Sequence, residues 1–193
     1  FCYPDINNVM RLLENHDTDR FLLEDPENLN VYKQAVTMLL TIPGIPQLYY
    51  GQELLMTGST KKDFGYVRPD MPGGWNGDEI SVFQESGRTA MQQEAFNFMK
   101  KMLHWRKGNA AISKGKMKHF MPRSNVYVYE RSYNGKSILV IMNGVNKEVD
   151  LDLTFYKEVI GDRTNSKNVL TDSNVPLGKK LHLQPKEVLV LEL

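Results

Sequence analysis

Two clusters of polar side chains in the first half of the chain could act on a sugar. Asn15-His16-Asp17 follows the mostly apolar residues 9–13, and Gln52-Glu53 follows the apolar residues 45–50. When a glycosidic bond breaks, a carboxylate such as Asp17 can stabilise the positive charge on the sugar ring, and His16 can donate a hydrogen bond to a hydroxyl. Asn15 and Asp17 are also common turn-capping residues, so the tripeptide alone leaves a structural role open.

A third candidate group lies in the irregular stretch between residues 51 and 87. Arg68 and Asp70 offer a forked cation and a carboxylate for sugar hydroxyls, and Trp75 offers an aromatic face for stacking. The structural alternative is that Arg68 pairs with Asp70 to hold a loop while Trp75 packs against the barrel. Long loops inside a compact domain are usually functional or mobile, which favours a role for this stretch.

The elements around these residues are predicted to alternate between strand and helix. Residues 9–13 and 45–50 are short apolar runs typical of buried strands, and residues 31–42 carry apolar side chains at helical spacing. Asp25-Pro26-Glu27 predicts the start of that helix, and Pro43-Gly44 predicts its end. Strand, helix and strand with short connections form one parallel unit, and in parallel barrels the functional groups follow the strand ends.

The sequence pattern changes after a second predicted helix at residues 91–107. Asn134-Gly135 is a strong signal for a two-residue hairpin between strands at 126–131 and 137–142. Further short strands are expected near 149–153, 168–171, 180–183 and 187–193, and this spacing predicts a small antiparallel sandwich. The methionines of the helix, Met91, Met99 and Met102, are expected to pack in a core. Four tyrosines are also expected to be strand and core residues, and a sugar-stacking surface is the alternative for them: Tyr127, Tyr129, Tyr133 and Tyr156.

Composition argues against several classes of partner. With 24 basic and 23 acidic residues well mixed along the chain, no basic face for nucleic acid is expected. No apolar run approaches the roughly 20 residues that span a membrane. The single cysteine, Cys2, permits no internal disulfide, and His104, His119 and His182 lack ligand spacing, so no metal site is predicted. No phosphate-binding loop is present, and no cofactor is expected.

Three segments resemble the alpha-amylase family of glycoside hydrolases. Residues 12–17 (Leu-Leu-Glu-Asn-His-Asp) resemble the motif that ends the family's seventh barrel strand, and residues 44–53 resemble its eighth strand, with Gln52 where the family usually has aspartate. Residues 68–75 narrow the resemblance to neopullulanases and cyclomaltodextrinases. The resemblance implies that Asp17 is the third catalytic carboxylate and that His16 binds sugar at the cleavage subsite. It also implies a substrate-binding role for Arg68, Asp70 and Trp75.

The fold class implied is an α/β barrel remnant followed by an all-β antiparallel sandwich. Residues 1–108 would be the last two strand-helix units of a TIM-type barrel and residues 109–193 the sandwich, with the boundary between 108 and 112. In the family the nucleophile and the general acid precede the seventh strand, so the isolated chain is predicted to be inactive. Glu14 or Glu53 beside Asp17 is a conceivable substitute pair, which nothing in the sequence supports.

The intact parent is expected to be a retaining glycoside hydrolase acting on alpha-1,4-glucans such as starch, pullulan or cyclodextrins. Two alternatives stay open: a transglycosylase of the same family, and a non-catalytic glucan-binding or structural module. Because an opened barrel exposes unpaired strand edges, self-association of the chain is also predicted. The sequence does not set the preferred glucan, and for the compartment it gives only a slight preference for an extracytoplasmic location.

Overall fold

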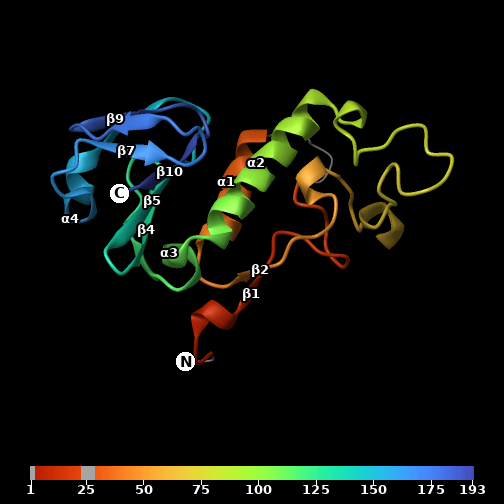
Figure 1. Ribbon diagram of the computed structural model, residues 1–193, viewed down its shortest axis with the longest axis horizontal. Helices are drawn as coiled ribbons and strands as arrows, with labels where there is room; N and C mark the ends of the chain where they lie inside the picture. Colours follow the sequence, from red (N-terminus) through yellow and green to blue (C-terminus); the bar gives the residue numbers. More distant parts are fainter. Residues whose placement is uncertain (1–2, 23–28) are drawn as a thin grey trace. The chain divides into compact units, whose positions relative to one another are not determined.

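The computed structural model describes residues 3–22 and 29–193, which form two compact units (Figure 1). We call Met10–Leu39 with Pro46–Lys101 the helical unit, and the chain start to Val9 with Leu40–Ile45 and Met102–Leu193 the sheet unit. The predicted helix start at Asp25-Pro26-Glu27 and the lone Cys2 lie outside the described residues.

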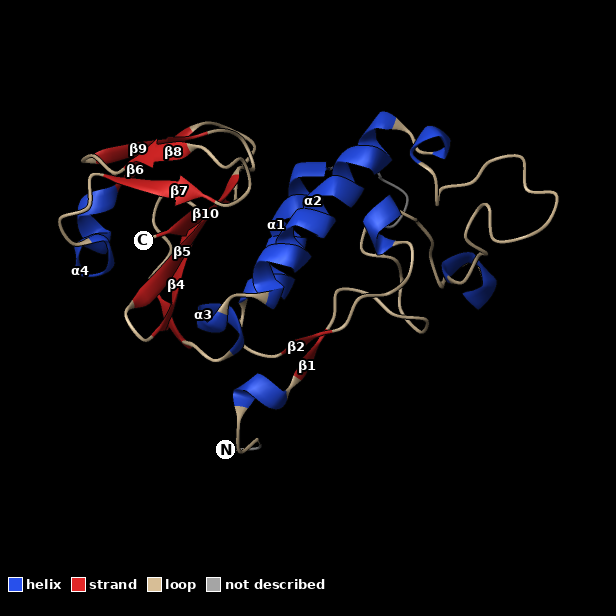
Figure 2. Ribbon diagram, viewed as in Figure 1, coloured by secondary structure: helices blue, strands red, loops and turns tan. Residues whose placement is uncertain are grey.

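The helical unit contains most of two helices, α1 (Leu29–Thr41) and α2 (Ala90–Lys107), which confirm the two predicted helices. α1 ends one residue before its predicted end, and α2 begins one residue before its predicted start. They lie side by side (Figure 2). Lys33 and Glu94 form an ion pair of 2.5 Å between them, and the rings of Tyr32 and Phe98 meet edge to face at 6.4 Å. Helical spacing of apolar residues places Tyr32 and its neighbours on the inner face, where burial stabilises the helix.

Only short segments of the two predicted parallel strands pair with each other. β1 (Met10–Arg11) and β2 (Ile45–Pro46) form a two-stranded sheet. The Gln47 amide donates to the Arg11 carbonyl at 2.7 Å, and the Ile45 amide donates to the Val9 carbonyl at 2.9 Å. Both partners advance in the same direction, so the pair is parallel. β1 and β2 are therefore shorter than the predicted strands at 9–13 and 45–50. Each strand has a single neighbour among the described residues, and the residues beyond the ladder leave the strand conformation.

The long stretch after β2 contains three short 3-10 helices, η2 (Gln52–Leu54), η3 (Phe64–Val67) and η4 (Glu85–Gly87), and otherwise irregular backbone. It begins at Gly51, whose φ of 77° lies in the left-handed region. Residues with side chains rarely adopt this backbone conformation, so the tight turn after β2 favours glycine.

The sheet unit is built on two antiparallel sheets, which confirms the predicted sandwich (Figure 2). The larger has the strand order β3-β4-β5-β10-β7-β8, and the smaller pairs β6 with β9. The predicted hairpin turn is present, with positive φ at Asn134 (48°) and Gly135 (79°). The strands are β3 (Lys116–His119), β4 (Val126–Tyr133), β5 (Lys136–Asn143), β6 (Val149–Asp152), β7 (Asn165–Asn168), β8 (Asn174–Pro176), β9 (Lys180–Leu183) and β10 (Val188–Glu192).

Two strands were missed and one was misplaced in the sequence-based prediction. β3 and β8 are the edge strands of the large sheet, and edge strands carry the lysines and prolines that weaken a strand pattern. β7 ends at Asn168, which is where the predicted strand began. The prediction was misplaced because the buried side of β7 carries the polar residues Ser166 and Asn168 instead of apolar ones. Two one-turn helices, α3 (Ala110–Ser113) and α4 (Lys157–Ile160), were also not predicted.

The central strands of the large sheet, β4, β5 and β10, are buried on both faces. One face packs on the small sheet through alternating aliphatic residues such as Val128, Leu139 and Leu183, which is the core of the sandwich. The opposite face buries Tyr129 and Arg131 completely. Arg131 donates from Nη1 to the Thr41 carbonyl at 2.6 Å, and from Nη2 to the Ile112 and Gly115 carbonyls at 2.8 Å each. Burial lowers the pKa of this guanidinium to about 10, and the nearby Arg106 charge adds to the effect.

Candidate functional site

Asp17 lies at the centre of a small hydrogen-bonded cluster in the helical unit. One carboxylate oxygen accepts a hydrogen bond from Arg68 Nη2 at 3.0 Å, and the other lies 3.1 Å from His16 Nε2. Arg68 Nε also donates to the His16 carbonyl at 2.8 Å. Because Arg68 lies 51 residues further along the chain than Asp17, the fold has brought together two of the segments predicted to share a site.

The local turn that presents this cluster is formed by the side chains of Asn15 and Thr18. The Asn15 side chain accepts a hydrogen bond from the Asp17 amide at 2.8 Å, and the Asn15 amide donates to the Thr18 hydroxyl at 3.0 Å. This Asx turn supports the structural role that the sequence left open for Asn15. The turn does not use the Asp17 carboxylate. That carboxylate bonds to Arg68, and the Asp17 side chain is 61% exposed.

A buried ion pair lies beneath the exposed cluster. Arg20 and Glu14 are 0% and 2% exposed, and Arg20 Nη1 lies 2.9 Å from Glu14 Oε1. Arg20 also donates to the carbonyls of Tyr50 and Val67, at 2.6 and 3.1 Å, and the Phe21 amide donates to Glu14 Oε2 at 2.6 Å. The Arg20 guanidinium therefore links three segments. It bonds Glu14 after β1, Tyr50 after β2, and Val67, which directly precedes Arg68.

Glu14 is consequently not a second catalytic carboxylate beside Asp17. Both of its oxygens are bonded to Arg20 and Phe21, and its side chain is buried. Sequence reasoning missed this pair. The signal was available in the form of an acidic residue at the end of an apolar strand with an arginine six residues later.

A further contact joins the segment after β1 to the start of the long loop. The Asp19 carboxylate accepts hydrogen bonds from the Thr60 amide at 2.6 Å and the Thr60 hydroxyl at 2.9 Å, which lower the pKa of Asp19. The Arg20 amide donates to the Gly58 carbonyl at 2.9 Å. A Cβ at Gly58 would lie 2.1 Å from the Tyr66 carbonyl oxygen, so this close approach of two loop segments requires glycine.

The structure does not bring Asp70 and Trp75 to this cluster. Within residues 3–22 and 29–193, the Asp70 side chain makes no hydrogen bond or ion pair, and the Trp75 side chain is 67% exposed. The Arg68–Asp70 pair of the structural alternative is wrong, because Arg68 pairs with Asp17 instead. Their predicted role in substrate binding is untested. The loop is held near Arg68 by Tyr50, whose hydroxyl donates to the Pro69 carbonyl at 2.8 Å.

Most of the other residues considered in the sequence are buried or partly buried in the two units. Gln52 is buried in η2, and Tyr129 and Tyr156 are buried in the sheet unit, so these two tyrosines offer no sugar-stacking surface. Met99 and Met102 are core residues as predicted, whereas Met91 is 36% exposed. No three His, Cys, Asp or Glu side chains of the described chain lie together as metal ligands would. No helix of the described residues is long and apolar enough to cross a membrane.

Two segments of the chain match models of known protein families. Residues 4–92 match the model of the alpha amylase catalytic domain, and residues 117–192 match that of the cyclo-malto-dextrinase C-terminal domain. The chain belongs to the alpha-amylase family. The alpha-amylase-family catalytic match contains the whole Asp17, His16 and Arg68 cluster, and the resemblance inferred from the sequence is confirmed.

Individual relatives agree with this membership. A cyclomaltodextrin glucanotransferase of a Bacillus species is 32% identical over 89% of this chain and 22% of its own length. A cyclomaltodextrinase of Thermoanaerobacter pseudethanolicus is 28% identical over 97% of this chain and 29% of its own length. The solved alpha-amylase of H. orenii superposes with a TM-score of 0.71 at 25% identity, covering 95% of this chain and 39% of that one. The chain thus spans less than a third of the length of these two sequence relatives.

Proposed function

We propose that the Asp17, His16 and Arg68 cluster forms part of the substrate subsite of a retaining glycoside hydrolase acting on alpha-1,4-glucans. The observation that carries the proposal is the geometry of Asp17, whose carboxylate is held between Arg68 at 3.0 Å and His16 at 3.1 Å while staying exposed. The family membership and the names of the relatives, a cyclomaltodextrinase and a cyclomaltodextrin glucanotransferase, support this substrate class.

The cluster can stabilise the transition state and orient the sugar. An exposed carboxylate with two fixed cationic or donor neighbours keeps free lone pairs, which accept hydrogen bonds from sugar hydroxyls. Its negative charge favours the positive charge of an oxocarbenium-like ring. Arg68 positions Asp17 and the His16 backbone at once, so the reacting ring would meet a preorganised surface. Asp70 and Trp75 would contact sugar units further from the bond that breaks.

Retaining hydrolysis also needs a nucleophile and a general acid on opposite sides of the bond, about 5–5.5 Å apart. Glu14 is engaged by Arg20, and no hydrogen bond or ion pair of the described residues couples Glu53 to Asp17. We therefore infer that the two other carboxylates belong to parts of the parent protein outside this sequence and that the isolated chain is inactive.

The parallel β1–β2 pair supports the further proposal that residues 1–108 are the last two strand-helix units of a TIM-type barrel. The sandwich would then occupy residues 109–193. The interval between the two family matches, residues 93–116, supports a boundary near residue 108.

Hydrolysis of cyclodextrin, pullulan and starch by the purified chain, beside the full-length parent, tests this proposal. The parent should cleave these glucans and the chain should not, and Asp17→Asn in the parent should abolish most turnover. Asp162→Asn serves as the matched control, because Asp162 is an exposed carboxylate of the sheet unit, away in sequence from both the Asp17 cluster and residues 68–75. Cleavage by the chain alone, or full activity of the Asp17 variant, would overturn the proposal.

A transglycosylase is the second candidate, favoured by the 32% identity to a glucanotransferase. The same carboxylates serve transfer to a sugar acceptor. Product analysis of the parent with and without added maltose separates the two activities, since a transferase passes most glycosyl units to the acceptor whereas a hydrolase passes most of them to water.

A partial barrel also implies self-association. Met10 and Ile45, on or beside the β1–β2 ladder, are 60% and 54% exposed. Such apolar strand edges invite pairing with another chain. Sedimentation at micromolar concentration should therefore show dimers or larger species, and a strict monomer would contradict this part of the proposal.

A further inference from the structure

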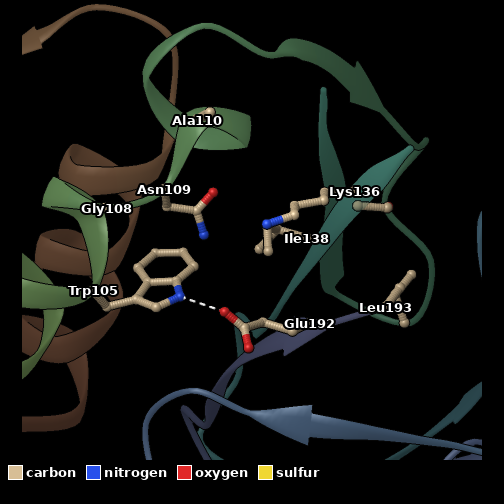
Figure 3. Close-up of a pocket in the computed structure, with 9 residues that line it drawn as sticks. Trp105, Gly108, Asn109, Ala110, Lys136, Ile138, Glu192 and Leu193 are labelled. Carbon is tan, nitrogen blue, oxygen red and sulfur yellow. Dashed lines mark hydrogen bonds between the residues drawn. The ribbon is translucent and has the colours of Figure 1, made fainter. Parts of the chain in front are cut away.

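A pocket of about 460 Å³ opens on the sheet unit, where the end of α2 and the start of α3 meet the neighbouring strands β5 and β10 (Figure 3). Its volume lies in the range of about 300–1,000 Å³ that is typical of small-molecule sites. The half-buried indole of Trp105 and the buried side chain of Ile138 form apolar walls. The polar groups around them decide which ligands the pocket can take.

The first polar feature is a hydrogen bond that fixes both the indole and a carboxylate. Trp105 Nε1 donates to Glu192 Oε1 at 2.7 Å, although the two residues are 87 positions apart. The bond engages one oxygen of Glu192 and leaves the second as an acceptor. It also holds the rigid indole plane at the pocket wall, so little side-chain entropy would be lost when a ligand packs on it.

The second feature is a pair of donors on the other sides of the pocket. The Asn109 side-chain oxygen accepts a hydrogen bond from the Ala111 amide at 3.0 Å, which leaves the amide nitrogen as a donor. The side chain of Lys136 forms no ion pair or hydrogen bond within the described part of the chain. Figure 3 shows the Asn109 nitrogen and the Lys136 ammonium both extending toward the space beside Trp105 and Glu192.

This combination fits a neutral polyhydroxyl ligand better than a charged one. The side chains that line the pocket include one cation and one anion, so an anionic ligand is repelled by Glu192 and a cationic ligand is repelled by Lys136. A vicinal diol, in contrast, can donate to the free carboxylate oxygen and accept from the ammonium or the amide. The C–H face of a sugar ring can at the same time cover the indole.

We propose that the pocket formed by Trp105, Asn109, Lys136 and Glu192 is a saccharide-binding site, separate from the Asp17 cluster. All four residues belong to the sheet unit, whereas Asp17, His16 and Arg68 belong to the helical unit. The site would take one or two sugar units of a glucan and retain the polymer on the protein. It does not depend on whether the Asp17 cluster is catalytic.

Titration of the ¹⁵N-labelled chain with maltotriose, followed by NMR, tests the site directly. Trp105 and Trp75 are the two tryptophans of the sequence, so the indole N–H region holds two signals that Trp75→Phe assigns. The Trp105 signal should move and saturate at millimolar maltotriose, since its N–H lies in the site. The Trp75 signal reports sugar binding in the helical unit, so the two sites are distinguished in one experiment.

Two conservative variants test which groups bind. Lys136→Gln and Glu192→Gln each remove a charge but little volume. Each should weaken maltotriose binding by about three- to tenfold, because a hydrogen bond to a charged group is exchanged for a weaker one to a neutral amide. Lys147→Gln is the matched control, because Lys147 is an exposed lysine of the same unit that does not line the pocket. It should bind as the unchanged chain does.

Three results would overturn the proposal. The first is a Trp105 signal that does not move in a saturable way with maltotriose. The second is a larger response to inorganic phosphate than to maltotriose, which would make the pocket an anion site. The third is unchanged affinity in both Lys136→Gln and Glu192→Gln, each confirmed as folded by its spectrum.

Discussion

Removing one partner of the buried Arg20–Glu14 pair is predicted to destabilise the helical unit far more than removing one partner of the exposed Arg68–Asp17 pair. The two pairs have nearly equal lengths, 2.9 and 3.0 Å, but side-chain exposures of 0% and 2% against 44% and 61%. Glu14→Gln keeps the size of the side chain and an acceptor for the Phe21 amide, yet leaves Arg20 charged and buried without a counter-ion.

Removing one partner of a buried pair typically costs about 3–5 kcal/mol, whereas an exposed pair contributes about 0–1 kcal/mol. For a chain of this size the first cost corresponds to a thermal midpoint lower by roughly 6–20 °C. Asp17→Asn, the matched control, should lower the midpoint by less than about 4 °C.

Thermal unfolding followed by circular dichroism measures both variants. Hydrogen exchange of the Phe21 amide, which donates to Glu14, adds a local readout and should accelerate strongly in Glu14→Gln alone. If Glu14→Gln and Asp17→Asn shift the midpoint equally, burial does not govern the strength of these pairs here, and the reasoning is refuted.

Three further predictions concern single positions. Arg131→Lys should cost about 2–4 kcal/mol in urea unfolding, because a lysine cannot reach the three carbonyls that the buried guanidinium bonds, and an unchanged midpoint would contradict that role. The hydrogen bond to Asp150 raises the pKa of His182, so its stabilising contribution is complete below about pH 6.5 and is lost as the pH rises through the raised pKa. In an NMR titration Asp150→Asn should lower the His182 pKa, and no change would refute the cause. Gly58→Ala should lower the thermal midpoint clearly, because its Cβ would meet the Tyr66 carbonyl at 2.1 Å, and a neutral effect would show that the two loop segments can separate.

Local patterns in the sequence determined the helices, the Asn134-Gly135 turn and most central strands. Helix periodicity and turn preference act within a few residues, so α1, α2 and the β4–β5 hairpin were predictable. Residues 12–17 and 44–53 were likewise recognisable as family motifs from their residue types and order. The edge strands β3 and β8 were not, since their composition reflects solvent and edge protection rather than a buried face.

Only the tertiary structure decided which side chains meet. Arg68 could have paired with the nearby Asp70, yet it bonds Asp17, 51 positions away. Glu14 belonged to the same motif as Asp17, but its burial against Arg20 makes it a structural residue. The Trp105–Glu192 bond joins residues 87 positions apart and creates a pocket that no sequence pattern indicated. Such contacts depend on how the whole chain closes its loops and buries its charges, and those free energies are not contained in any local segment.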